Sequence, residues 1–286
     1  MRFLIFGGNG FLGNHLYHFI KKKFHVKIVT RRKGNGIYLK YYNLKNLKNI
    51  ICKETPDIII NSVALTNVDK CEVKKKLAYD TNVKITKLIS NAITSLVYKK
   101  PFLIHISSDQ VYSGLGPHSE KKPKPINYYS KTKLLSEKFI NLKEGCVLRT
   151  NFLGYSRNHG GLNHWIINTV KRNSKIYGFK NIYFSPLSLN TLSRIIIMIS
   201  KKKIGGVYNL GSVGGVSKGN YIKKFLNIKF KNYRHFKMIN YHKKSNKKLI
   251  ALRPLDMRLN CKKIMAKYKI KLPKTTFEVN KIIKNF

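Results

Sequence analysis

Three side chains of this sequence have the chemistry needed to transfer a proton to a carbonyl oxygen. Tyr129 and Lys133 stand four residues apart in a predicted helix, so the phenol and the ammonium share one helical face. An adjacent cation favours the phenolate and lowers the tyrosine pKa, which makes the phenol a workable proton donor and acceptor near neutral pH. Ser107 and Ser108 follow a predicted strand at its carboxyl end, where the hydroxyl of one of them can donate a hydrogen bond to a substrate carbonyl.

A glycine-rich turn near the start of the chain is suited to binding the phosphates of a dinucleotide. Gly7, Gly10 and Gly13 form the spacing GxxGxxG between a short apolar run and a helical pattern. The first glycine permits a tight turn, the second lets the backbone approach a pyrophosphate, and the third lets the helix pack closely. Because this is the strand–turn–helix context that the fingerprint requires, we predict a dinucleotide site that includes Phe11 and Leu12.

The end of the second predicted strand indicates which nicotinamide cofactor the site prefers. A protein specific for NAD places an acidic residue there to hold the ribose 2′-hydroxyl. Here the sequence has no acid and reads Thr30-Arg31-Arg32, and arginines suit a 2′-phosphate. We therefore predict that these three residues contact NADPH, with NADH as the alternative cofactor. A hydride from such a cofactor and a proton from Tyr129 would together reduce a ketone.

The first half of the chain alternates strands and helices in the way needed to position these residues. The predicted strands are Arg2–Phe6, Val26–Thr30, Asp57–Asn61, Phe102–Ile106 and Cys146–Leu148, and the predicted helices are Phe11–Lys22, Val73–Leu96 and Asn127–Asn141. Continuous apolar strands alternating with helices are typical of a parallel sheet covered on both faces, and ligands bind at its carboxyl edge. The pattern predicts an α/β, Rossmann-type doubly wound fold, with a dinucleotide-binding domain over residues 1–150.

After residue 150 the regular alternation of strands and helices gives way to short elements separated by glycine and lysine. We predict helices at Leu162–Lys171 and Leu187–Lys201, a strand at Val207–Leu210 and a last helix at Cys261–Tyr268. Residues 151–286 are therefore interpreted as a smaller, mixed α/β substrate-binding lobe, with part of the chain returning to the sheet.

The sequence is strongly basic, with 58 Lys and Arg against 11 Asp and Glu and a formal net charge of +47. The basic residues are spread along the whole chain, and the accompanying abundance of Asn, Ile and Tyr is typical of A+T-rich codons. Charge alone gives non-specific attraction without sequence readout, so we predict no specific nucleic-acid partner. A positive field does attract anionic cofactors and nucleotide-linked substrates.

The sequence gives little support to a membrane protein, a disulfide scaffold or a zinc module. No apolar stretch approaches the roughly 20 residues that span a bilayer, and the N-terminus has no signal-like cleavage pattern. The four cysteines are widely scattered, without a CxxC pair or a zinc-like histidine spacing: Cys52, Cys71, Cys146 and Cys261. We predict a cytoplasmic protein with reduced thiols, no membrane partner and no metal site.

Several motifs, in order, resemble those of the dTDP-4-dehydrorhamnose reductase family within the extended short-chain dehydrogenases/reductases. Besides GxxGxxG and YxxxK, residues 56–72 (PDIIINSVALTNVDKCE), continuing to Asn82, resemble the family's PDxxxNxxAxTxVDxxE…N. Residues 107–114 (SSDQVYSG) resemble S(T/S)DxV(F/Y)xG, and Arg253-Pro254 with Leu259 resembles RP…L. The resemblance covers nearly the whole chain.

This resemblance implies reduction, with NADPH or NADH, of the 4-keto group of a nucleotide-linked 6-deoxyhexose, with Tyr129 as proton donor. It implies that Lys133 holds the nicotinamide ribose and that Ser108 meets the substrate carbonyl. It further implies cofactor contacts from Asn61, Ala64, Thr66 and Asn82 and substrate contacts from Asp109, Gln110 and Arg253. A homodimer is left open.

Two alternatives remain beside a simple reductase. Enzymes that also epimerise, such as GDP-fucose synthase, carry a cysteine where this chain has Asp109, which disfavours that activity. The regulatory beta subunit of methionine adenosyltransferase resembles the same family and keeps both SSD and YxxxK, so a non-catalytic dinucleotide-binding role stays open. Departures from the family pattern at residues 151–154 and 256–257 lie in the predicted substrate lobe, so the sugar and its nucleoside carrier are undetermined.

Overall fold

A computed structural model describes residues 1–154, 161–231, 233–242 and 249–285, which form two compact units. The first unit comprises Met1–Ser108, Asn127–Arg149 and Ser193–Tyr208, and the second comprises Asp109–Ile126, Thr150–Leu192 and Asn209–Phe286. Each unit draws on more than one stretch of the chain. The domain boundary predicted after residue 150 stays a prediction, because compactness alone does not show which stretch folds independently.

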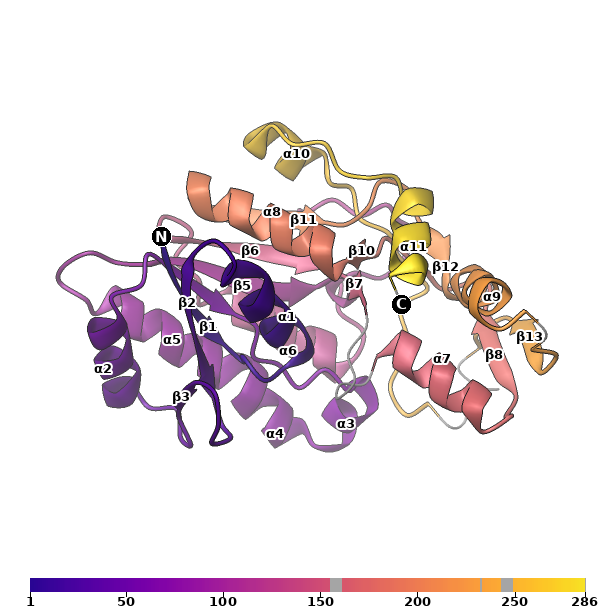
Figure 1. Cartoon of the computed structure of the whole chain (residues 1–286), viewed down its shortest axis with the longest axis horizontal. Helices are drawn as coiled ribbons and strands as arrows, with labels where there is room; N and C mark the ends of the chain where they lie inside the picture. The colour runs from indigo at the N-terminus through magenta and orange to yellow at the C-terminus, as the bar shows by residue number, and fades with distance from the viewer. Residues whose placement is uncertain (155–160, 232, 243–248, 286) are drawn as a thin grey trace. The chain divides into compact units, whose positions relative to one another are not determined.

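Within the described residues, the first unit is built on a seven-stranded sheet with the order β11-β6-β5-β4-β1-β2-β3 (Figure 1). Its strands are β1 (Arg2–Phe6), β2 (His25–Thr30), β3 (Ile37–Tyr38), β4 (Ile58–Asn61), β5 (Phe102–Ser108), β6 (Gly145–Thr150) and β11 (Gly206–Leu210). β1 pairs in parallel with β2 and β4, and β4 pairs in parallel with β5. The predicted α/β, Rossmann-type parallel sheet is confirmed.

The central strands β4, β5 and β6 are buried along their whole length because helices cover both faces of the sheet. The first unit contains α1 (Phe11–Ile20), α2 (Leu44–Glu54), α3 (Val68–Val73), α4 (Lys75–Tyr79), the π-helix η1 (Asp80–Lys84), α5 (Ile85–Thr94), α6 (Tyr128–Glu137) and most of α8 (Leu189–Lys202). Leu47 of α2 and Ile89 of α5 join Ile59 of β4 in one hydrophobic cluster. α8 lies on the opposite side of the sheet from α5 (Figure 1).

The single long helix predicted from Val73 to Leu96 is wrong. The structure divides this stretch into α3, α4, η1 and α5, and Lys74 between α3 and α4 has φ −105° and ψ 62°, outside the helical region. The π-helical turn at Asp80–Lys84 inserts one residue per turn and thereby rotates the helical face. Apolar periodicity alone does not reveal such a turn, which here carries the buried Asn82.

The second unit consists of short strands and helices around a separate core. Its elements are the 3₁₀ turn η2 (Asp109–Val111), β7 (Phe152–Leu153), α7 (Leu162–Lys171), β8 (Ile176–Phe179), β9 (Tyr183–Phe184), β10 (Leu187–Ser188), β12 (Val216–Ser217), α9 (Lys218–Lys229), β13 (Phe236–Ile239), β14 (Asp256–Met257), α10 (Lys262–Tyr268) and α11 (Thr275–Lys284). The core includes Phe184, Phe225 and Ile283. The predicted last helix is α10, but the chain continues into α11, which buries Val279, Ile282 and Ile283 on one face.

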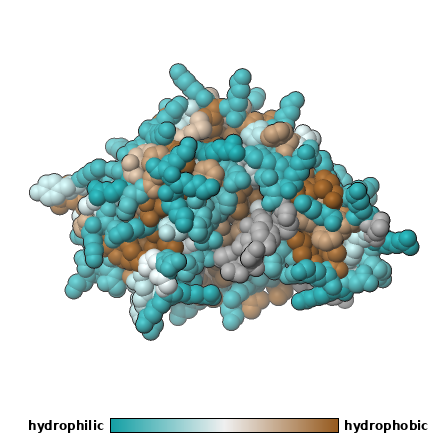
Figure 2. Space-filling model, in the orientation of Figure 1, coloured by the Kyte–Doolittle hydropathy of each residue, from teal (hydrophilic) through white to brown (hydrophobic). Residues whose placement is uncertain are grey.

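The surface is dominated by hydrophilic side chains in the view of Figure 2, as the 58 basic residues require. Among the described residues, no helix has the length and apolar character needed to cross a membrane.

Candidate active site

The glycine turn between β1 and α1 has the geometry expected of a phosphate cradle. Gly7 has φ +82°, which favours glycine, and the Gly10 amide donates to the Gly7 carbonyl at 2.8 Å. A Cβ at Gly13 would lie 2.2 Å from that carbonyl oxygen, so only glycine lets α1 pack this closely. No side chain caps α1 at Gly10, whose backbone is extended. The turn therefore presents backbone groups and a helix N-terminus to a ligand.

The end of β2 places two exposed cations beside the glycine turn. The Gly8 amide donates to the Val29 carbonyl, so the turn and the end of β2 are direct neighbours. Thr30 is buried and its hydroxyl donates to the Arg32 carbonyl at 2.7 Å, which orders the start of the following loop. Arg31 and Arg32 are both exposed. The fit to a 2′-phosphate rests on these guanidinium groups and on the absence of an acid in residues 30–36, all of which the structure describes.

The three residues predicted for catalysis lie on two packed elements, the carboxyl end of β5 and the first turns of α6. Asn127 begins α6 with a capping box: its side chain accepts from the Ser130 amide at 2.8 Å, and the Ser130 hydroxyl accepts from the Asn127 amide. Tyr129 follows, 7% exposed, with its ring packed against Cys71 and Ala78. The cap therefore fixes where the helix starts, and with it the direction of the phenol.

Lys133 connects α6 to the end of β5. Its side chain is 2% exposed, and Nζ donates to the Ile106 carbonyl at 2.8 Å, two residues before Ser108. Burial lowers the pKa of Lys133 to about 8, against the opposing effect of the Glu137 carboxylate. The amine and the alcohol are thus held at the same strand end, with Tyr129 one helical turn away from the amine.

A buried ion pair lies directly behind this strand end. Glu137 and Arg149 have side chains 6% and 5% exposed, and Arg149 Nη2 donates to Glu137 Oε2 at 2.6 Å. Arg149 Nε also donates to both carboxylate oxygens, at 3.0 and 3.1 Å. The Ser107 hydroxyl donates to Glu137 Oε1 at 2.6 Å, so the residue preceding Ser108 is fixed to the same helix that carries Lys133.

Asn61 and His105 form a second buried polar chain under the site. Asn61 Nδ2 donates to Thr86 Oγ1 and contacts His105 Nδ1 at 3.2 Å, and Asn61 Oδ1 accepts from the Val63 amide. His105 Nε2 contacts Ser136 Oγ at 2.9 Å. Burial, together with the charge of Lys133, lowers the pKa of His105 well below its usual value. The Asn61 side chain therefore joins β4 to α5 and β5, and His105 joins β5 to α6. The predicted cofactor contact of Asn61 stays a prediction.

The segment after β4 is held by Asn82. Asn82 Oδ1 accepts from the Leu65 amide at 2.7 Å, and its Nδ2 donates to the Leu65 carbonyl and to Thr132 Oγ1. This tie fixes the loop that carries half-buried Ala64 and exposed Thr66. Asn82 thus supports the predicted cofactor loop, and direct contact of these three residues with a cofactor stays a prediction.

The residues predicted to contact substrate lie in the second unit. Asp109 is 1% exposed and accepts from Asn151 Nδ2 at 2.8 Å, while Gln110 and Arg253 are half-buried. Arg253 Nη1 donates to the Ala251 carbonyl at 2.9 Å. Lys218, which the motifs did not single out, is in electrostatic range of both Asp109 and Arg253; burial lowers its pKa, Asp109 raises it and Arg253 lowers it. This cluster holds two cations and one carboxylate.

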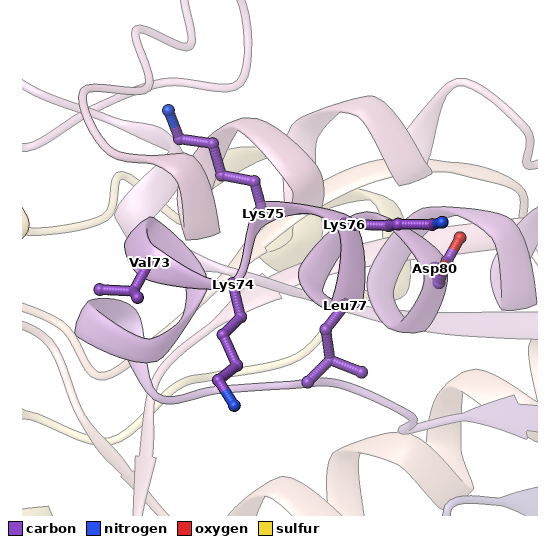
Figure 3. Close-up of a pocket in the computed structure, with 6 residues that line it drawn as sticks. All are labelled: Val73, Lys74, Lys75, Lys76, Leu77 and Asp80. Carbon is purple, nitrogen blue, oxygen red and sulfur yellow. The ribbon is translucent and has the colours of Figure 1, made fainter.

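A separate hollow lies on α3, α4 and η1 (Figure 3). It is lined by Val73, Lys74, Lys75, Lys76, Leu77 and Asp80, all in the described part of the chain. None of the residues predicted for catalysis, cofactor or substrate is among them. Within the described residues, no group of three or more His, Cys, Asp or Glu side chains is placed to hold a metal ion.

Sequence reasoning missed Glu137, Arg149 and His105. One signal was available: Glu137 stands four residues after Lys133, so it extends the face that begins with Tyr129. Arg149 and His105 lie inside strands, and only the sheet order brings them beside α6.

Comparison with known proteins gives a match over the full length. The family model described as RmlD substrate binding domain matches residues 1–286. The dTDP-4-dehydrorhamnose reductase of Salmonella typhimurium is 27% identical over 184 residues, which cover 61% of this chain and 60% of that protein. The subunit beta of methionine adenosyltransferase 2 from Xenopus tropicalis is 30% identical over 159 residues, 53% of this chain and 47% of that protein.

Among solved structures, dTDP-4-dehydrorhamnose reductase from Bacillus anthracis in complex with NADP superposes with a TM-score of 0.85. The match covers 100% of this chain and 99% of that one at 21% sequence identity, so it establishes a common fold. The aligned parts of the two curated relatives above span about three fifths and about half of their lengths.

Proposed function

Because the chain belongs to the RmlD substrate binding domain family, we propose that it uses NADPH to reduce the 4-keto group of a nucleotide-linked 6-deoxyhexose. The observation that carries this proposal is the buried Lys133 ammonium, bonded to the Ile106 carbonyl beside Ser108, with Tyr129 one turn earlier on α6. A hydroxyl and an ammonium at one strand end, with a phenol one turn earlier on the helix that carries the ammonium, are the groups that carbonyl reduction requires.

The glycine turn fits a dinucleotide, since a Cβ at Gly7 would clash with Ser62 and Val63, and one at Gly13 with the Gly7 carbonyl. Only glycine at these positions lets the turn and α1 fold tightly enough to present backbone N–H groups to a pyrophosphate. When bound, the nicotinamide supplies the hydride that reduces the carbonyl carbon. Ser108 then donates a hydrogen bond to the carbonyl oxygen, and Tyr129 gives that oxygen its proton. Lys133 stabilises the phenolate left on Tyr129 by its positive charge. Arg31 and Arg32 give the preference for a 2′-phosphate.

In the second unit, Asp109, Gln110 and Arg253 are the proposed contacts for the sugar nucleotide. The excess of positive charge in the cluster of Lys218, Arg253 and Asp109 suits the diphosphate of such a substrate. The match to dTDP-4-dehydrorhamnose reductase of Salmonella supports a deoxysugar linked to a nucleoside diphosphate. A cytoplasmic location and a homodimer complete the proposal.

The direct test incubates the protein with NADPH and a panel of 4-keto-6-deoxy sugar nucleotides and follows the nicotinamide absorbance. We expect absorbance to fall with at least one member of the panel, more slowly when NADH replaces NADPH. If no substrate of the panel is reduced at protein concentrations where NADPH is bound, the proposed reductase activity is wrong.

A second candidate function is favoured by the match to a methionine adenosyltransferase subunit. In that case the chain binds NADPH and has no turnover, and Tyr129→Phe changes nothing measurable. Titration of NADPH by fluorescence, run beside the absorbance assay, separates the two functions, because binding with turnover supports the reductase and binding without it supports the regulatory role.

A further inference from the structure

Glu137 is a buried acid on the helix that carries Tyr129 and Lys133. It is 8% exposed, in a chain with only 11 Asp and Glu residues, and no part of the proposed reaction uses it. It lies one helical turn after Lys133 on α6, and its carboxylate accepts from Ser107, the residue before Ser108. It therefore lies between two of the three groups that the reaction needs.

We propose, on the basis of the proposed function, that Glu137 is a positioning residue that keeps the Lys133 ammonium charged and holds the Ser108 end of β5 against α6. The argument has a geometric and an electrostatic part. Geometrically, Ser107 Oγ bonds to Glu137 Oε1 at 2.6 Å, and Lys133 Nζ bonds to the Ile106 carbonyl at 2.8 Å. Two successive residues of β5 are thus tied to two successive turns of one helix face.

The electrostatic part concerns what a buried ammonium needs to remain protonated. Burial favours the neutral amine, and the negative charge of Glu137 opposes it, so the pKa of Lys133 stays at about 8. His105, on β5, is also in range of Lys133. Its pKa is lowered by burial and, to a smaller extent, by the charge of Lys133, so it adds no positive charge of its own. From α3, Glu72 accepts the Tyr128 amide at the start of α6.

Arg149 and Ser107 hold the Glu137 carboxylate in its buried position. The guanidinium donates to both carboxylate oxygens, and the Ser107 hydroxyl provides a further donor. Because Arg149 and Ser107 together hold both of its oxygens, the Glu137 carboxylate cannot rotate toward solvent or toward Lys133. It acts on the ammonium through its charge, at a fixed position.

The test measures the titration of Lys133 by NMR of labelled lysine side chains, with the Lys133 signal assigned by its loss in Lys133→Met. In Glu137→Gln we expect the midpoint to fall by about one pH unit, because the carboxylate no longer stabilises the ammonium. In the same variant the fall of kcat/KM at high pH should move to lower pH by a similar amount. Glu137→Asp, which keeps the charge, should leave the midpoint within a few tenths of a unit of the wild type.

Two further variants keep the test decisive. Glu144→Gln removes the acid of an ion pair with Lys100 that is about 30% exposed, and should leave the Lys133 midpoint unchanged. Glu137→Gln combined with Arg149→Met removes both buried charges, so it retains the readout if the single variant does not fold. In the double variant the loss of the Arg149 cation offsets part of the loss of the carboxylate, so the Lys133 midpoint should still fall, by less than in the single variant.

The proposal is overturned if the midpoint of Lys133 stays at the wild-type value in the folded Glu137→Gln or double variant. That result is independent of the proposed function, because the titration needs no sugar nucleotide. Conversely, if the midpoint falls as expected while no substrate is reduced by the wild type, the reductase fails and the electrostatic role of Glu137 stands.

Discussion

The two units hold their candidate functional residues in different ways. In the first unit, Tyr129 and Lys133 are positioned by one capped helix, and Ser108 by the end of one buried strand. In the second unit, positions are set by side chains that join distant segments. Asn209 accepts from the Tyr112 hydroxyl at 2.7 Å and donates to the His118 carbonyl at 2.7 Å. Helix and strand rules therefore place the candidate residues of the first unit, and long-range contacts such as Ser107 to Glu137 support them. In the second unit, the short elements depend on long-range polar contacts for their placement.

Under the proposed function, this difference separates the residues for chemistry in the first unit from the residues for substrate specificity in the second. A group that transfers a proton must be held to a fraction of an ångström, which rigid elements with buried supports achieve. The second unit uses strands of two residues, such as β7, β9 and β12, whose arrangement depends on partners such as Glu278, which accepts from the Ser188 amide and the Thr191 hydroxyl. Substitutions in the two units should therefore have different kinetic signatures.

The largest effect is expected from Tyr129→Phe, set against Arg253→Ala in the second unit. Loss of the phenol should lower kcat by about 10²–10⁴-fold with NADPH binding retained, because only proton transfer is removed. Arg253→Ala should instead raise KM by about tenfold, because it removes a binding contact. Steady-state kinetics and NADPH titration check both variants. Tyr128→Phe, one residue away, is the matched control, and an equal loss of kcat in that variant would remove the special role of Tyr129.

Each unit contains an ion pair whose contribution to the free energy of unfolding can be compared: a buried pair in the first unit and a partly exposed pair in the second. Arg149→Met leaves the Glu137 carboxylate buried without its main partner and should lower the free energy of unfolding by about 3–5 kcal/mol. Arg258→Met breaks the pair with Asp256 in the second unit, where the arginine side chain is 35% exposed, and should lower it by about 1 kcal/mol. Urea unfolding followed by circular dichroism measures both. Equal losses would mean that the supports of the two units are energetically alike.

Because His105 is buried in the first unit, we expect it to make the free energy of unfolding fall at acidic pH. Its pKa is lowered in the folded state, so the unfolded chain takes up a proton that the folded chain does not once the pH falls below about 6.5. The contribution of His105 to the free energy of unfolding is therefore at its maximum above that pH. Below it, the free energy of unfolding falls by about 1.4 kcal/mol for each pH unit. Urea unfolding between pH 7 and pH 5 should show a shallower dependence in His105→Gln. The exposed His25→Gln should keep the wild-type slope, and a shallower slope there as well would point to a different group.

The smallest effect is expected at the exposed end of β2. Replacing Arg31 and Arg32 by Ala should weaken NADPH binding by about tenfold and leave NADH binding nearly unchanged, because only NADPH carries the 2′-phosphate. Isothermal titration with each cofactor measures the difference. Equal weakening of both cofactors would show that the two cations act only through the general positive field.

The same contrast explains how much the sequence could predict. The strands of the first unit were predictable because residues such as Ile58, Ile59 and Ile60 are apolar without interruption, as parallel strands buried on both faces require. The glycine turn and the YxxxK spacing follow from local geometry. The π-helical turn around Asn82 was not predictable, since its extra residue is stabilised by contacts to Leu65 and Thr132 from distant segments.

Most of the second unit could not be predicted from local sequence patterns for the same reason. Strands of two residues carry almost no periodicity, and Lys218 becomes a neighbour of Asp109 and Arg253 only through the fold. Glu137 lies between these cases, because its spacing from Lys133 was visible, whereas its bonds to Ser107 and Arg149 depend on the sheet.

The most direct test of the reductase follows a deuterium atom. The protein is incubated with NADPH that carries deuterium in both hydrogen positions at carbon 4 of the nicotinamide, and with a 4-keto-6-deoxy sugar nucleotide. The product is analysed by mass spectrometry and NMR. We predict one deuterium at carbon 4 of the sugar in the wild type, and product formation reduced at least a hundredfold in Tyr129→Phe. A product without deuterium, or one formed equally fast by Tyr129→Phe, would contradict the account.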